Sequence, residues 1–326
     1  MSIPDPMTDI QIPKKEDLDA AWERIRPHVH RTPIVKCSSL ESRLKRPLHL
    51  KAENLQKTGS FKIRGALNHV LSLDDDDVSN GVVTYSSGNH AQAVALAARI
   101  RGVPATIVMP PSAPGVKREA TEGYGARVIL EGETASERKA VARAFSRETG
   151  AAIVPPYDDF QVVCGQASVA REIVEDCPQV HTVYVPVGGG GLIAGTCLAV
   201  HHYGSGIRIV GVEPEQADAM NRSLNADQVE ISQPGETIAD GLKPDFPGRI
   251  NFEIVKRYVE RIILVTEGEI KDAMELLITR TKLLVEPSGA AAFAGALFWG
   301  SADDGETACV ISGGNVDIRR IGEILQ

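Results

Sequence analysis

The sequence predicts an α/β fold built from two doubly wound parallel sheets, with a site in the cleft between them. Three observations lead to this prediction. The chain has 326 residues, of which 43% are hydrophobic, so it can bury a large core, and this length suggests two lobes. Short apolar runs alternate with helical patterns along the chain. Glycine-rich loops follow several of these runs, at the strand ends where open α/β sheets bind ligands.

The alternation begins after a helix expected over residues 61–71. Apolar runs typical of buried strands occur at residues 81–85, 105–109, 127–130 and 152–154, and helical patterns lie at 91–101 and 134–149. The alternation resumes with strands at 182–187, 207–212, 262–265 and 307–311, and with a helix at 192–202. Because strands joined through helices pair in parallel, each block predicts its own parallel sheet.

Two breaks in the pattern suggest where the lobes divide. Four aspartates at residues 74–77 separate the first helix from the next strand, and two prolines at 155–156 interrupt the chain again. We therefore expect a small domain of residues 80–154, inserted into a larger discontinuous domain of residues 1–73 and 157–326. The aspartate run is read as a solvated turn and not as a metal site.

Composition excludes several function classes. A net charge of −8 with no basic block argues against nucleic acid and against an anionic membrane surface. No apolar stretch is long enough to span a bilayer, and no basic-then-apolar leader is present. The five cysteines are odd in number and lack metal-like spacing, so reduced thiols in a cytoplasmic protein are expected.

The segment GSFKIRG at residues 59–65 places Lys62 at the start of the first expected helix. Amides at a helix N-terminus and burial both disfavour the ammonium form, as a lysine that forms a Schiff base requires. Taken alone, a lysine in such a segment is more often an ordinary surface residue. The other loops decide between these readings.

Three further loops carry suitable chemistry. The segment SSGNH at residues 86–90 offers hydroxyl, amide and imidazole groups for a small carboxylate or a planar ring. Four glycines at 188–191 stand between a strand and a helix, which suits a phosphate cup, although a flexible turn is the alternative. Neither a nucleotide P-loop nor a dinucleotide motif fits this run. Near the C-terminus, SGGN at 312–315 follows a strand directly.

Taken together and in order, these motifs resemble one family. SFKIRGA (60–66), SSGNHAQ (86–92), the four glycines, Glu286-Pro287 and SGGN are similar to pyridoxal-phosphate enzymes of the tryptophan-synthase-β fold group, in the serine/threonine dehydratase and serine racemase branch. The resemblance covers about residues 31–315. It implies fold type II, with pyridoxal 5'-phosphate held in the cleft between the two domains.

The resemblance also implies roles for individual residues. Lys62 would carry the cofactor and act as the general base, Asn89 would donate to the ring's phenolic oxygen, and Ser312 would face the pyridine nitrogen. A serine cannot keep that nitrogen protonated, which favours loss of a β-substituent over transamination. The expected cofactor-binding residues are Phe61, Lys62, Asn89, Gly188, Gly189, Gly190, Gly191, Leu192, Glu286 and Ser312. The expected substrate-binding residues are Ser86, Ser87, Gly88, Asn89, His90 and Arg138.

Two of these assignments have alternatives. Ser87 corresponds to the racemase serine on the ring face opposite the lysine, where a hydroxyl could return a proton to the carbanion. It could instead bind the substrate carboxylate or cap a helix. Arg138 falls where racemase-like enzymes hold an arginine near that carboxylate, or it lies on the solvent face of its helix.

A divalent cation is a further expectation from the resemblance. Residues 213–219 resemble a segment that gives magnesium or calcium a glutamate, a backbone carbonyl and an acidic residue. Here Glu213 and the Ala217 carbonyl would be ligands, but Ala219 replaces the last acid and Asp218 lies beside it. Arg280 and Lys282 resemble nucleotide-binding positions of racemases, and ordinary surface charges are the alternative.

The resulting expectation is a catabolic dehydratase, or ammonia-lyase. It would eliminate water from L-serine, L-threonine or 3-hydroxyaspartate and give a 2-oxo acid and ammonia. The alternative is a serine- or aspartate-type racemase with side elimination. A silent cofactor carrier is disfavoured by the intact Lys62, and a β-replacement synthase by His90. The resemblance implies a homodimer.

Overall fold

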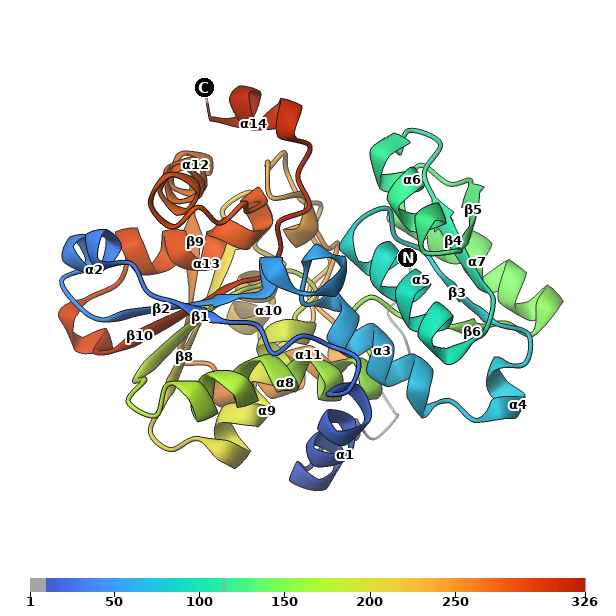
Figure 1. The fold of residues 1–326 in the computed structure, drawn as a ribbon, viewed down its shortest axis with the longest axis horizontal. Coiled ribbons are helices and arrows are strands. Elements are labelled where there is room, and N and C mark those ends of the chain that lie inside the picture. Colours follow the sequence, from blue (N-terminus) through green and yellow to red (C-terminus); the bar gives the residue numbers. More distant parts are fainter. Residues whose placement is uncertain (1–9, 114, 326) are drawn as a thin grey trace.

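The computed structural model describes residues 10–113 and 115–325 and contains two sheets that lie beside one another (Figure 1). The larger sheet has six strands in the order β1-β2-β10-β7-β8-β9. Its strands are β1 (Ile34–Val35), β2 (Leu48–Ala52), β7 (Thr182–Pro186), β8 (Arg208–Pro214), β9 (Arg261–Val265) and β10 (Thr307–Ile311). All neighbours pair in parallel except β1 and β2, which are antiparallel.

The smaller sheet has four parallel strands in the order β5-β4-β3-β6. These are β3 (Val82–Thr84), β4 (Ala105–Met109), β5 (Arg127–Leu130) and β6 (Ala152–Ile153). The two parallel α/β units confirm the predicted fold class.

Fourteen α-helices are found in the described part of the chain. Those in the first half are α1 (Lys15–Ile25), α2 (Ser38–Leu44), α3 (Lys62–Ser72), α4 (Asp75–Val78), α5 (Asn89–Arg101), α6 (Gly115–Gly123), α7 (Ala135–Thr149) and α8 (Phe160–Asp176). The others are α9 (Gly191–Tyr203), α10 (Ala219–Ala226), α11 (Arg249–Tyr258), α12 (Glu267–Leu276), α13 (Pro287–Phe298) and α14 (Ile318–Ile324). Short 3-10 turns include η1 (Glu53–Leu55), η2 (Lys57–Gly59) and η3 (Asp240–Leu242). None of these helices is long and apolar enough to cross a membrane.

Helices cover both faces of the larger sheet, as Figure 1 shows. In β7, Val183 and Val185 pack with α8, α9 and α11, whereas Tyr184 between them packs with α12 and α13. This alternation follows from the two-residue period of a strand, and it explains why every residue of β7 is buried.

The core of the smaller sheet extends beyond its own strands. Ile63, Leu67 and Val70 of α3 pack in one cluster with Val94 of α5 and Ile107 of β4. Helix α3 also lies against α8 of the larger unit. It therefore joins the two sheets, and the exact domain boundary near residues 73–80 stays a prediction.

Most expected elements occur within one to three residues of the predicted bounds, and the strands at 105–109, 127–130 and 307–311 agree to the residue. The sequence reasoning missed β2, because His49 and Lys51 interrupt its apolar pattern although both are buried. The reading of the aspartate run as a turn was wrong. These residues open the short helix α4, where carboxylates favour the helix N-terminus.

Candidate active site

Lys62 begins α3 and faces the segment that joins the two sheets. Its Nζ donates a hydrogen bond to the Pro156 carbonyl at 2.8 Å. Burial lowers the pKa of Lys62 to about 8, although the Glu286 carboxylate acts in the opposite direction. An amine with this pKa is partly neutral near physiological pH, so it can act as a nucleophile and as a base.

The loop of residues 188–191 joins the end of β7 to the start of α9. Gly190 has a φ of 91°, in the left-handed region that favours glycine. A Cβ on Gly189 would lie 2.3 Å from the Tyr157 ring. Asn251 Nδ2 and the Gly248 amide both donate to the Gly189 carbonyl, at 2.7 and 3.0 Å. The loop is thus fixed, and the first amides of α9 give it the character of an anion site.

Asn89 connects the smaller unit to two segments of the larger one. Its Nδ2 donates to Glu286 Oε1 at 2.6 Å, and its Oδ1 accepts from Asn315 Nδ2 at 2.8 Å. An amide nitrogen carries two hydrogens, so Asn89 keeps one for a ligand. These bonds fix which way the amide faces.

Ser312 is far from Lys62 in the sequence but lies close to it in space. The Phe61 amide donates to the Ser312 carbonyl at 3.1 Å, which places the end of β10 against the start of α3. The buried Ser312 hydroxyl lies 3.5 Å from the Ser288 carbonyl. A Cβ on Gly313 would lie 2.4 Å from Glu286 Oε1, so a larger residue there would require this carboxylate to move.

The loop of residues 86–90 joins β3 to α5, and its members face different environments. Ser86, Ser87 and Gly88 are half-buried, and no hydrogen-bond partner of the Ser87 side chain is found in the described part of the chain. His90 differs, because its ring is buried and its Nε2 lies 3.1 Å from the Val154 carbonyl. Burial lowers the pKa of His90 to about 3, so the ring is neutral. These contacts are more consistent with a His90 ring that supports the loop from inside the protein than with a ring that contacts a substrate.

Arg138 lies in the first turn of α7 and is half-buried. Its Nη1 donates to the carbonyls of Gly132 and Glu133 at 3.2 and 2.6 Å. Its Nε is buried, with no hydrogen-bond partner in residues 10–113 and 115–325. Burial lowers the pKa of Arg138, whereas Glu133, Glu137 and Asp245 oppose this shift. Since Asp245 belongs to the larger unit, Arg138 lies toward that unit and not on a remote solvent face.

The expected cation site gains no support. Glu213 is buried at the end of β8, and its two carboxylate oxygens accept the amides of Met220 and Asn221 at 2.9 and 2.8 Å. Its carboxylate therefore binds the start of α10. Among the described residues no group of three or more His, Cys, Asp or Glu could hold a metal, consistent with Ala219 in place of the acid. The predicted magnesium or calcium at Glu213 and Ala217 is thus unsupported, since both oxygens of Glu213 are engaged by backbone amides.

Several residues of this site were missed by the sequence reasoning. Tyr157, Asn251 and Asn315 are brought to the glycine loop or to Asn89 by contacts that span 32 to 226 positions of the chain. The Ser60 hydroxyl is another, because it is buried without a hydrogen-bond partner in the described chain. Asn315 and Ser60 do lie in the SGGN and GSFKIRG motifs, but neither was assigned a role. For Tyr157 the local signal was the pair of prolines before it, which marks the passage between the two sheets.

Glu286 provides a pH-dependent test of the site. Burial, and to a smaller extent Asp240, raise the pKa of Glu286 from 4.5 to about 7. Between these values the folded protein binds a proton that the unfolded chain has lost, so stability should fall as the pH rises. The decrease should be at most about 3 kcal/mol. Urea unfolding of the cofactor-free protein, compared with Glu286→Gln across pH 4.5 to 7.5, measures it. A difference between the two proteins that does not vary with pH would contradict the shifted pKa.

The donor set fits pyridoxal phosphate. The glycine loop and the start of α9 suit its phosphate, Lys62 suits its aldehyde, Asn89 has a free N–H for its phenolic oxygen, and the Ser312 hydroxyl suits its ring nitrogen. Asn89 comes from the smaller unit, the glycine loop and Ser312 come from the larger one, and Lys62 begins α3, which joins the two.

Known proteins agree with this reading. The chain is 42% identical over 315 residues to the L-threonine dehydratase catabolic TdcB of Staphylococcus aureus, covering 95% of this chain and 91% of that protein. It is 39% identical over 315 residues to the L-threo-3-hydroxyaspartate ammonia-lyase of Saccharomyces cerevisiae, covering 96% and 97%. The structure of maize serine racemase superposes with a TM-score of 0.92 at 39% identity, covering 96% of this chain and 97% of that one.

A family model described as pyridoxal-phosphate dependent enzyme matches residues 25–313, which include the lysine, the glycine loop, Asn89 and Ser312. This match spans most of the chain, and the residues within it form the site described above. The chain belongs to the family of pyridoxal-phosphate-dependent enzymes.

Proposed function

We propose that the protein is an ammonia-lyase that eliminates water from a β-hydroxy amino acid: L-threonine, L-serine or 3-hydroxyaspartate. The products are ammonia and the corresponding 2-oxo acid. The observation that carries the proposal is Lys62, whose Nζ is held by the Pro156 carbonyl with a pKa of about 8, in a chain about 40% identical to two named lyases.

Bound pyridoxal phosphate supplies an electron sink for the negative charge that develops on the substrate Cα. The residues of the chain do the rest. The neutral Lys62 amine can take the proton from Cα, and the Pro156 carbonyl fixes the direction of Nζ. Water lost across Cα and Cβ leaves an enamine, which gives the 2-oxo acid and ammonia when it takes up water again. No net water is consumed.

Substrate binding is assigned to groups that have no fixed partner. Arg138 has a buried Nε without a hydrogen-bond acceptor in the described chain, and a substrate carboxylate is a suitable partner for it. The half-buried Ser87 hydroxyl, which has no hydrogen-bond partner in the described chain, offers a further donor, and beside it the Gly88 amide donates to the Ser86 hydroxyl at 3.4 Å. A cytoplasmic location and a homodimer are parts of the proposal, supported by five free cysteines and by the resemblance respectively.

A racemase is the second candidate, favoured by the overlap with maize serine racemase and by Ser87. Racemisation needs an acid on the face of the substrate opposite Lys62, whereas elimination needs only the lysine. Ser87→Ala should therefore abolish interconversion of L- and D-serine. Elimination from the L-substrate should persist, reduced by about tenfold to a hundredfold if the hydroxyl also orients the carboxylate. Equal loss of both reactions would make Ser87 a binding residue.

A product screen tests the proposal. The purified protein with pyridoxal phosphate is incubated with L- and D-serine, L-threonine and both 3-hydroxyaspartates, and 2-oxo acid, ammonia and enantiomer ratio are followed together. Stoichiometric 2-oxo acid and ammonia from at least one L-substrate is expected. Formation of the D-enantiomer without 2-oxo acid would replace the lyase by the racemase.

A further inference from the structure

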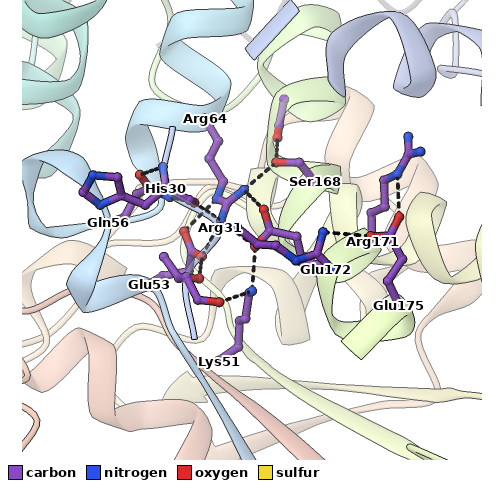
Figure 2. A network of polar contacts seen from close by, with 12 residues as sticks. His30, Arg31, Lys51, Glu53, Gln56, Arg64, Ser168, Arg171, Glu172 and Glu175 are labelled. Carbon is purple, nitrogen blue, oxygen red and sulfur yellow. Dashed lines mark hydrogen bonds and ion pairs between the residues drawn. The ribbon is translucent and has the colours of Figure 1, made fainter. Parts of the chain in front are cut away.

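Four charged side chains form a cluster around Arg64, which lies two positions after Lys62 in α3. We call Lys51, Glu53, Arg64 and Glu172 the buried charge cluster (Figure 2). All four side chains are completely buried. They come from β2, η1, α3 and α8, so the cluster connects four elements at one point.

Arg64 is the centre of the cluster. Its Nε and Nη2 donate to the two oxygens of Glu53 at 2.8 and 2.7 Å, which is a bidentate pair. Its Nη1 and Nη2 donate to the two oxygens of Glu172 at 2.7 and 3.0 Å. Lys51 Nζ donates to Glu172 Oε2 at 2.6 Å, as Figure 2 shows. The two positive charges balance the two carboxylates, and the Arg64 guanidinium links Glu53 of η1 to Glu172 of α8.

The segment that leads into Lys62 is tied to the same region. Gln56 accepts the His30 amide at 2.9 Å and donates to the His30 carbonyl at 2.7 Å, and Arg64 Nη2 donates to that carbonyl as well. Helices α3 and α8 also touch closely, because a Cβ on Gly165 would lie 2.4 Å from the Arg64 carbonyl. The turn before α3 is therefore bound to His30, and the first turn of α3 is bound to His30 and packs against α8.

Stability alone does not account for such a cluster. Moving charges out of water is expensive, and replacing a buried ion network by apolar residues of similar volume is often neutral or stabilising. What the network does supply is geometry, since a bidentate guanidinium tolerates little rotation. In an α-helix, side chains two positions apart leave the axis in roughly opposite directions, at about 200°. Rotation of α3 that broke the Arg64 contacts would therefore displace Lys62.

We propose that Arg64 is a positioning residue for Lys62: bound by Glu53 and Glu172, it fixes the rotation of α3 and so the place of the Lys62 amine beside the Pro156 carbonyl. Its action is geometric. The shift in the pKa of Lys62 has other causes, namely burial, which lowers it, and the Glu286 carboxylate, which acts in the opposite direction. The inference rests on the proposed function only where turnover is measured.

The test uses Arg64→Lys, which keeps the charge but cannot form the bidentate pair. The matched control is Arg31→Lys, because Arg31 pairs with Glu175 and Asp176 at the exposed edge of the same α8. For Arg64→Lys we expect kcat to fall by about tenfold to a hundredfold, with KM within about threefold and the midpoint of the pH profile unchanged. The control should match the wild type.

Two further readouts do not depend on turnover. They are the rate at which cofactor-free protein forms its covalent link with added pyridoxal phosphate, and the circular dichroism of the cofactor band per bound cofactor. Both should fall in Arg64→Lys and not in Arg31→Lys. If the wild type makes no 2-oxo acid, the proposed function fails while these two readouts still decide the present inference.

A merely structural role predicts a different pattern. Activity would then fall only in proportion to the fraction of folded protein, with an unchanged cofactor band per bound cofactor, and this result would overturn the proposal. Should Arg64→Lys give no folded protein, Glu172→Gln decides by the same criteria, since it keeps the shape of the side chain but replaces one of the two acceptor oxygens of Glu172 with a donor.

Discussion

Lys62→Ala is expected to abolish the covalent link to the cofactor and to lower the rate of elimination by about a thousandfold or more. One amine serves both as the anchor of the cofactor and as the base at Cα, so its removal affects two steps at once. The melting temperature of the cofactor-free protein should not fall. Burying the amine lowers its pKa, which means that the folded state disfavours its charge and that alanine removes this penalty.

The measurements are steady-state elimination and thermal unfolding, each without and with added cofactor. Lys271→Ala on α12 is a suitable control, because that lysine lies outside the site. If Lys62→Ala kept the visible band of the cofactor and retained more than about a tenth of the activity, another lysine would have to carry both roles.

Gly189→Ala is expected to weaken cofactor binding by about a hundredfold, or ~3 kcal/mol. The added Cβ would lie 2.3 to 2.5 Å from three atoms of the Tyr157 ring, a separation that requires either the ring or the loop to move. Because Asn251 and Gly248 hold the Gly189 carbonyl, movement of the loop also disturbs the amides that would contact the phosphate. Titration of cofactor-free protein with pyridoxal phosphate measures the effect.

Two comparisons make this result specific. Gly123→Ala, at the end of α6, meets no atom within 4 Å and should bind the cofactor like the wild type. The double variant Gly189→Ala/Tyr157→Ala should recover part of the affinity, since the clash is removed. A change of less than about threefold for Gly189→Ala alone would show that the loop yields easily and that the cup is not pre-formed.

The sequence was sufficient for the parts of the fold that repeat locally. Strands such as β4, β5 and β10 are short, mainly apolar runs next to clear breaks, so their bounds followed from composition. Lys62, the glycine loop and Ser312 could also be predicted from the sequence, because each lies just past a strand or at the start of a helix. Placement at such ends is a local property, and it can be read without knowing which elements are neighbours.

What could not be predicted depends on contacts between distant segments. β2 was not predicted because the partners that let Lys51 be buried are distant in the sequence: the Thr32 carbonyl lies 19 positions away and Glu172 lies 121 positions away. The Tyr157 ring against Gly189 and the Asn315 amide on Asn89 are of the same kind. His90 was expected to bind substrate, and that assignment stays a prediction; the contact of its ring with the Val154 carbonyl, 64 positions away, could not be predicted from the loop sequence.

The central claim is that Lys62 holds pyridoxal phosphate in this site. Reduction of the reconstituted protein with borohydride fixes the covalent link, and peptide mass spectrometry then locates it. We expect one cofactor-derived mass per chain, on the peptide that contains Lys62. A mass on any other lysine, or no modified peptide after full reconstitution, would contradict the account.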